Sequence, residues 1–324
     1  MQNRPTQSLP PEEKKEILDE FYHITRAPND MAYAVAAMKI LSERIKKSKA
    51  TTLMGLQHEL KDAIGTLTSE VSEISVKSGC ELLMCFLTRT SSGSGDFQSC
   101  KQRLIEQSEV FHSMTTQNRN TIAQMTERFF RDGLIILTHS YSRVVMNCLL
   151  HAAESTHFTV IVAEGGPSKP GIRTAKELAE HRIPVTVIPD IGVGAIMPRV
   201  DFVLVGAAAV VESGGVVNRL GTFQIACVAK EYKKPFYVAV ESYKFTRIYP
   251  LTLADLMTLT PIDQIPQSSE ITDLQNETKD QNLVKFEAPA LDYTPPSYVE
   301  LLFTDLGILC PSAVSDELIK LYHE

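Results

Sequence analysis

The chain has 324 residues, 44% of them hydrophobic and 22% charged, and its formal net charge is −7 at pH 7. This composition is typical of a globular protein with a hydrophobic core, and the length predicts two domains. The acidic balance, with no Lys/Arg-rich tract longer than residues 44–49, argues against nucleic acid as a direct partner.

The six cysteines form neither a CxxC pair nor a Cys/His cluster with the spacing of a zinc site. We therefore expect no metal, and free thiols in a reducing compartment. The N-terminus, MQNRPTQSLPPEEKK, has no apolar signal core. The longest apolar run, Phe202 to Val211, is too short to span a bilayer. A cytosolic protein without a membrane segment is predicted.

The first part of the chain shows helical patterns only. Residues 1–10 are expected to be a flexible tail. Pro11 is a good helix start, because proline suits the first turn and two glutamates follow it. A second helix is predicted with Asn29 or Asp30 as its capping residue, because apolar residues with helical spacing follow.

Further helix starts are predicted at Thr51 or Thr52 and, from a capping-box pattern, at Ser78. The segment SSGSGD after them is loop-like in composition. Two separate helical patterns then follow, over residues 97–114 and 122–129. Residues 11–131 are therefore expected to form one helical domain.

Strand patterns alternate with helical patterns after Gly133. This alternation predicts an α/β fold, in which residues 132–324 form a Rossmann-like domain with a parallel sheet. Residues 253–285 are a polar excursion without a sustained period, and a last helix is predicted over residues 312–322. The predicted strands cover residues 134–138, 159–163, 185–188, 202–206 and 236–240.

The stretch from Asp201 to Thr222 combines a buried strand with a glycine turn and a predicted helix start. The turn is Ser213-Gly214-Gly215, and the cationic Arg219 follows it. A glycine turn, a cation and a helix N-terminus capped by Thr222 together predict an anion site. An ordinary glycine-rich strand-to-helix connection explains the same pattern.

Catalytic motifs are absent from the sequence. His139 and Ser140 are adjacent on an extended chain, so their side chains point to opposite faces. No GxSxG elbow, GxGxxG fingerprint or P-loop is present. The carboxylates predicted at strand ends are Glu164, Asp190 and Glu241, which either cap loops or bind sugar hydroxyls. The residues alone thus predict a parallel-sheet domain with a small anionic-ligand pocket.

Several segments closely resemble the alpha-subunit family of eukaryotic translation initiation factor 2B. The resemblance covers nearly the whole chain, although the N-terminal tail and the SSGSGD loop are less typical. The segments are DMAYAVAAMKIL (30–41), ILTHSYSRVV (136–145), VGAAAVVESGGVVNRLGT (205–222), KPFYVAVESYKF (234–245) and LLFTDLGILCPSAVSDELIKLY (301–322).

This resemblance implies a regulatory, non-catalytic subunit of the exchange factor that returns initiation factor 2 from its GDP-bound to its GTP-bound form. Family members form a homodimer that joins two halves of a decamer with beta, gamma, delta and epsilon subunits. They also help to sense phosphorylation of the factor 2 alpha subunit, which inhibits translation initiation under stress. The helical domain is expected to contact that partner, and the residues carried over loosely for this role are Asp30, Val35, Lys39, Ser42, Arg44 and Ser78.

Dimerisation is expected to use the C-terminal domain. The apolar final helix and residues 301–309 would otherwise leave a sizeable apolar patch on a monomer.

The same superfamily includes isomerases that act on methylthioribose 1-phosphate and ribose 1,5-bisphosphate, with a catalytic cysteine and aspartate. The corresponding positions here are Ser140 and Gly215. Neither residue can replace a thiol or a carboxylate in proton transfer, so no catalytic residue and no required cofactor are expected. A sugar-phosphate-binding dimer or an isomerase is the alternative function.

The family's NKxGT motif is matched here by Asn218-Arg219-x-Gly221-Thr222. Arginine keeps the charge of lysine but changes the donor geometry. This match predicts a vestigial pocket for a sugar phosphate or a nucleotide monophosphate. Its expected lining is His139, Ser140, Glu164, Arg173, Gly214, Gly215, Asn218 and Arg219.

Overall fold

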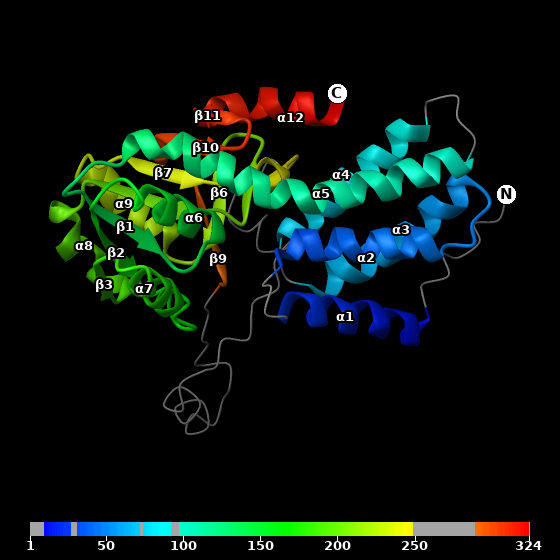
Figure 1. Cartoon of the computed structure of the whole chain (residues 1–324), viewed down its shortest axis with the longest axis horizontal. Helices are drawn as coiled ribbons and strands as arrows, with labels where there is room; N and C mark the ends of the chain where they lie inside the picture. Colours follow the sequence, from blue (N-terminus) through cyan, green and yellow to red (C-terminus); the bar gives the residue numbers. More distant parts are fainter. Residues whose placement is uncertain (1–9, 27–30, 72–73, 92–96, 249–288, 324) are drawn as a thin grey trace, which may run out of the picture.

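The computed structural model describes residues 10–26, 31–71, 74–91, 97–248 and 289–323. A helical part and an α/β part lie side by side along the longest axis of the molecule (Figure 1). The predicted N-terminal tail, except Pro10, most of the SSGSGD loop and the polar excursion at 253–285 lie outside these residues.

The helical part is a bundle whose core is formed by aliphatic side chains at helical spacing. Thr52 caps the third helix, as predicted, because its hydroxyl accepts a hydrogen bond from the Gly55 amide at 3.2 Å. The helices are α1 (Pro11–Arg26), α2 (Tyr33–Lys47), α3 (Leu53–Glu70), α4 (Ile74–Ser91) and α5 (Phe97–Thr126).

Two predicted helix starts are wrong. The capping position of α2 is occupied by Ala32, without a side-chain cap, so neither Asn29 nor Asp30 fills it. Ser78 lies inside α4, where its hydroxyl donates to the Ile74 carbonyl at 3.4 Å. A serine can satisfy its hydroxyl within a helix in this way, so the capping-box pattern alone did not mark a helix start.

The two helical patterns predicted at 97–114 and 122–129 belong largely to the single helix α5, of 30 residues. Leu104 packs in the core of the bundle, whereas Ile122 and Ala123 pack in the core of the α/β part. The first half of α5 packs in one core and the second half in the other, so its apolar residues form two separate patterns that predict two helices. The helix thereby connects the two parts of the molecule directly (Figure 1).

The main sheet has the order β11-β10-β7-β4-β1-β2-β3, and its paired strands are parallel except for β11. The predicted strands are confirmed, with shifts of one residue at β1 and at the end of β7. Without β11, the order is that of a Rossmann fold, which reverses direction at β1. The strands are β1 (Ile135–His139), β2 (Thr159–Ala163), β3 (Val185–Ile188), β4 (Phe202–Gly206), β7 (Phe236–Ala239), β10 (Leu301–Thr304) and β11 (Gly307–Leu309).

Helices cover both faces of this sheet, because alternate residues of each buried strand point to opposite sides. Ile136 packs with one group of helices, and its neighbour Leu137 packs with the other. The first group is α5, α6 (Arg143–Ala152) and α7 (Gly171–Glu180). The second is α8 (Val193–Ile196), α9 (Thr222–Glu231) and α12 (Val314–His323).

A second, four-stranded sheet of order β8-β5-β6-β9 was not predicted. The predicted strand-to-helix connection at the glycine turn is wrong, because residues 212–215 join β5 and β6 as a hairpin. Helix α9 begins only after β6. The strands are β5 (Ala209–Val211), β6 (Val216–Arg219), β8 (Phe245–Thr246) and β9 (Leu291–Thr294).

Within the described ranges, no helix is long and apolar enough to cross a membrane. The same ranges contain no group of three or more His, Cys, Asp or Glu side chains that could hold a metal ion.

Candidate functional site

A cavity of about 250 Å³ lies where the strand order reverses, beyond the ends of β1 and β4. Ligands of doubly wound sheets bind at this point. Both parts of the molecule line the cavity, since Tyr33 and Ser75 come from the helical part and Ser140 and Ala207 from the α/β part.

The turn between β1 and α6 forms one wall of the cavity. Ser140 has a positive φ of 62°, and two hydrogen bonds hold its backbone in this conformation. Its amide donates to the Ala163 carbonyl at 3.1 Å, and its carbonyl accepts from the Thr174 hydroxyl at 2.6 Å. Ser142 then caps α6 by accepting from the Val145 amide at 3.5 Å. The positive end of the α6 dipole therefore lies at the cavity wall.

A second helix N-terminus, that of α2, reaches the same cavity. Ala32, Tyr33 and Ala34 line it, and no side chain caps this helix end. Helix starts from the two parts of the molecule thus both favour negative charge in one cavity.

Cationic side chains surround the cavity. Arg143, Arg173, Arg219 and Lys244 line it, and Arg173 lies over the Tyr141 ring at 3.9 Å from the ring centroid. This stack fixes the direction of the guanidinium. Four cationic groups against one carboxylate, that of Glu241, make an environment suited to a small anion.

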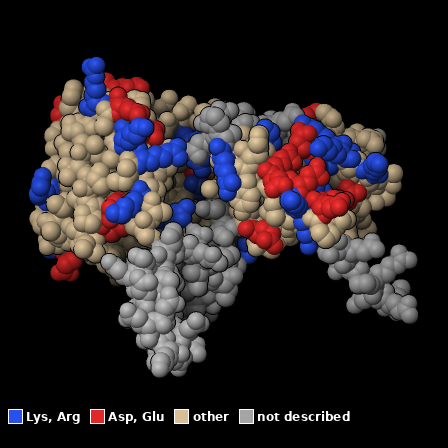
Figure 2. Space-filling model, turned by 90° about the horizontal axis from the view of Figure 1, so that it is seen from below, with Lys and Arg blue, Asp and Glu red and all other residues tan. Residues whose placement is uncertain are grey.

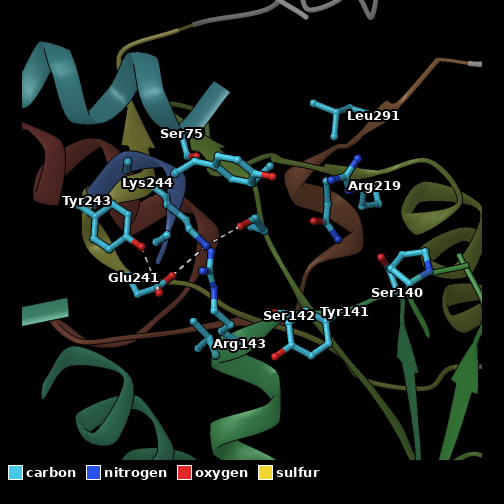
Figure 3. Close-up of a pocket in the computed structure, with 18 of the residues that line it drawn as sticks. Ser75, Ser140, Tyr141, Ser142, Arg143, Arg219, Glu241, Tyr243, Lys244 and Leu291 are labelled. Atoms are coloured by element: carbon cyan, nitrogen blue, oxygen red, sulfur yellow. Dashed lines mark hydrogen bonds and ion pairs between the residues drawn. The ribbon is translucent and has the colours of Figure 1, made fainter. Parts of the chain in front are cut away.

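Glu241 is a buried carboxylate held by three partners, of which Figure 3 shows Tyr243 and Lys244. Lys244 Nζ lies 2.9 Å from Oε2, while Arg119 Nε and the Tyr243 hydroxyl donate to Oε1 at 3.1 and 3.2 Å. Burial opposes ionisation of Glu241, but Lys244 and Arg119 outweigh it and lower its pKa to about 2. The carboxylate therefore stays charged and holds Lys244 at the cavity.

The anion site predicted at the start of α9 is filled by the chain itself. Asp292 of β9 accepts hydrogen bonds from the amides of Gly221 and Phe223 at 2.8 and 3.0 Å. Burial raises the pKa of Asp292 to about 7, although these hydrogen bonds act in the opposite direction. Thr222 does not cap the helix, since Gly221 takes that position and the Thr222 hydroxyl donates to the Arg219 carbonyl at 2.6 Å.

The structure brings together four of the eight predicted pocket residues, namely Ser140, Arg173, Asn218 and Arg219. Glu164 lies elsewhere and pairs with Lys169 at 3.1 Å.

His139 lies behind the cavity wall with its side chain fully buried. Its Nδ1 lies 3.4 Å from the Thr222 hydroxyl and its Nε2 lies 3.7 Å from Asp190 Oδ1.

Gly214 and Gly215 do not line the cavity, contrary to prediction. A Cβ on Gly214 would collide with the Pro311 carbonyl, and a Cβ on Gly215 would collide with the Tyr293 hydroxyl. Both glycines therefore serve close packing of the β5–β6 hairpin. Sequence reasoning missed Arg143, and the only signal was its position directly after Ser142, the capping residue of α6.

The structure corrects three of the predicted partner-binding residues. Val35, Ser42 and Ser78 are buried within the helical part, so none of them forms its surface. Lys39 is exposed, and Arg44 pairs with Glu13 and Glu16 at 3.3 and 4.0 Å. Asp30 lies outside the described residues.

The face shown in Figure 2 carries Lys and Arg side chains near the junction of the two parts, while Asp and Glu gather over the helical part. The exposed acidic side chains of α1 include Glu12, Glu13, Glu16 and Asp19. Where this face is formed by described residues, it shows no continuous basic surface of the kind that is typical of nucleic-acid binding.

Comparison with known proteins gives near-full-length matches. The model of the initiation factor 2 subunit family matches residues 27–311. A protein of Dictyostelium discoideum named translation initiation factor eIF2B subunit alpha is 44% identical over 310 residues, which are 94% of this chain and 96% of that relative. A ribose 1,5-bisphosphate isomerase of Pyrococcus furiosus is 31% identical over 296 residues, covering 90% and 89% of the two chains.

Among solved structures, a chain of the tetrameric eIF2B-beta2-delta2 complex from C. thermophilum has a similar fold. The TM-score is 0.74 at 21% sequence identity, over 96% of this chain and 95% of that chain. At this identity the match bears on the fold alone, and it agrees with the predicted α/β class.

Proposed function

Because the chain belongs to the initiation factor 2 subunit family, we propose that it is the regulatory alpha subunit of the exchange factor for initiation factor 2. The near-full-length match to a protein named as that subunit carries the proposal. In this role the chain acts in the cytosol and controls how fast factor 2 returns to its GTP-bound form.

The proposal includes a homodimer that joins two halves of a decamer with beta, gamma, delta and epsilon subunits. Leu306 and Ile319, from the β10–β11 turn and α12, are 41% and 51% exposed. Large apolar side chains at the surface of the C-terminal elements support an interface there.

The proposal also includes sensing of the phosphorylated alpha subunit of initiation factor 2. The helical part supplies the docking surface, and Lys39 is the predicted contact residue that the structure places at the surface without a described ion pair. A lysine is suited to contact an acidic or phosphorylated partner.

A pull-down of the tagged chain from native cytosol tests this function. We expect four further exchange-factor subunits in stoichiometric amounts, and enrichment of initiation factor 2 after its phosphorylation. Recovery of the chain as a dimer without these subunits would contradict the regulatory role and support the metabolite-binding alternative.

We further propose that the chain is not an isomerase, although an isomerase is among its relatives. Ser140 lines the cavity where the isomerases are expected to have a thiol, and Gly215 leaves no room for a carboxylate beside Tyr293. An assay with ribose 1,5-bisphosphate is expected to show no turnover, and turnover above the buffer rate would contradict this conclusion.

The cavity between the two parts is proposed to bind a sugar phosphate or a nucleotide monophosphate. Two helix starts and the side chains of Arg173, Arg219 and Lys244 support it. Calorimetry with ribose 5-phosphate tests the proposal. We expect Arg219→Met to weaken binding about tenfold or more, because a charge-assisted contact is lost. Lys176→Met, on the exposed side of α7, serves as the control, and equal binding by wild type and R219M would contradict the site.

A further inference from the structure

A line of polar side chains, all buried except the half-buried Asp190, connects the back of the cavity to its lining. Asp190 Oδ1 lies 3.7 Å from His139 Nε2, and His139 Nδ1 lies 3.4 Å from the Thr222 hydroxyl. That hydroxyl also accepts from the Asn218 side-chain amide at 3.1 Å, and Asn218 lines the cavity. The imidazole and Thr222 are fully buried, so a polar atom of either one that lacks a partner within the chain is destabilising.

The hydroxyl of Thr222 has one proton and uses it for the Arg219 carbonyl, at 2.6 Å. It can therefore only accept from its other neighbours. Asn218 donates one bond, and the contact with His139 is a hydrogen bond only when Nδ1 carries a proton. The arrangement thus assigns the neutral imidazole to the tautomer with hydrogen on Nδ1.

His139 Nε2 then carries no proton. It is buried and has no hydrogen-bond partner, while the carboxylate of Asp190 lies nearby. A second proton on Nε2 would turn this contact into a charge-assisted interaction. Both oxygens of Asp190 also accept hydrogen bonds from backbone amides. The Gly165 amide donates to Oδ1 at 2.9 Å and the Gly166 amide donates to Oδ2 at 2.6 Å, so the carboxylate is fixed in place.

We propose that His139 is a positioning residue for the cavity, which holds Asn218 and the Arg219 backbone through Thr222 and takes up a proton at Nε2 when an anion binds beside Arg219. The proton comes from solvent, one N–H bond forms, and no other bond changes. The inference rests on the proposed anion binding in this cavity.

The charges around His139 set the direction of this coupling. Burial is the main cause that lowers the pKa of His139, Asp190 acts in the opposite direction, and Arg219 lowers the pKa further. Asp292 of β9 faces the same turn through the Gly221 amide. An anion beside Arg219 offsets its charge, so the pKa of His139 rises on binding and the affinity for the anion falls as pH increases.

The first test needs no ligand. Nitrogen NMR of the full chain, with the His139 signals assigned by His139→Gln, is expected to show the tautomer protonated at Nδ1. Thr222→Val keeps the side-chain shape but removes the acceptor, and should shift the Nδ1 signal. A neutral tautomer protonated at Nε2, or an Nδ1 signal that T222V leaves unchanged, would overturn the proposed hydrogen bond from His139 to Thr222.

The second test measures proton uptake with sulfate, whose charge is constant between about pH 5 and pH 8. Calorimetry in buffers of different ionisation enthalpy is expected to show uptake of a fraction of a proton by wild type and clearly less by H139Q, in which Asp292 still titrates. The affinity of wild type should fall by about threefold or more across this range, and that of H139Q by less. His181→Gln, at an exposed position at the end of α7, should behave as wild type.

The outcomes separate the two proposals. Sulfate binding without proton uptake, or equal uptake by H139Q, would overturn the role of His139 and leave the cavity intact as a binding site. Failure of both sulfate and ribose 5-phosphate to bind would overturn the cavity proposal, and the proton coupling with it.

Discussion

Glu241 is the residue at which the cavity and the packing of α5 meet. Its partners Arg119 and Lys244 have side chains only 21% and 17% exposed, so removal of the carboxylate leaves two cations poorly solvated. We expect Glu241→Gln to lower the free energy of unfolding by about 3 kcal/mol at neutral pH, measured by urea denaturation. Glu43→Gln removes a more exposed pair with Lys46 and should change it by less than about 0.5 kcal/mol.

The stabilisation by Glu241 also depends on pH. Its pKa is lowered from 4.5 to about 2 in the folded chain, so the stabilisation is complete above 4.5 and is lost as pH falls toward about 2. The difference in unfolding free energy between wild type and E241Q should therefore shrink over this interval. A difference that stays constant from neutral pH to acid would show that the charge of Glu241 does not contribute.

At the scale of elements, the contact between α2 and α4 positions the helix start that lines the cavity. A Cβ on Gly79 of α4 would lie 3.2 Å from the Cβ of Ala34, which is closer than ordinary packing allows. We expect Gly79→Leu to lower the free energy of unfolding by about 1–3 kcal/mol and to weaken ribose 5-phosphate binding, because Ala34 lines the cavity.

Gly65 of α3 is the matched control for this substitution. No atom lies within 4 Å of a Cβ built there, so Gly65→Ala should raise the unfolding free energy by about 0.5–1 kcal/mol through helix propensity. Thermal unfolding of both variants checks the pair. A G79L variant as stable as wild type, with unchanged binding, would show that this helix contact does not shape the cavity.

The elements differ in how far the sequence predicts them. The parallel strands are continuous apolar runs, because both faces of the sheet are buried, and Thr159–Ala163 and Phe202–Gly206 are predicted to the residue. The second sheet was missed because β5 continues the apolar run of β4, and because β6 pairs with β9, which lies far along the chain.

The candidate site is predictable only in part, because some of its residues come together from segments that lie far apart along the chain. Ser140 directly follows β1, so the rule for doubly wound sheets points to it. Asn218 and Arg219 lie in β6 of the second sheet, and they were predicted from the glycine turn and the family motif instead. Tyr33 and Ser75 reach the cavity only through the packing of the helical part on the α/β part, which no local pattern in the sequence indicates.

At the scale of the whole molecule, the proposed dimer predicts an apolar interface on the C-terminal elements. Leu306→Asp combined with Ile319→Asp is expected to raise the dimer dissociation constant by about 100-fold or more, measured by sedimentation equilibrium. Met54→Asp changes a more exposed apolar residue on α3, 81% exposed, and should leave dimerisation unchanged. A stable dimer of the double variant would place the interface elsewhere.

The role as a regulatory subunit is tested most directly by sedimentation velocity of a reconstituted mixture. The purified chain is added to the four other exchange-factor subunits, and the size of the resulting particle is followed with increasing amounts of the chain. The account predicts that the half-assemblies join into one particle of about twice their mass, with one dimer of this chain per particle. Half-assemblies that sediment unchanged, with the chain remaining separate, would contradict it.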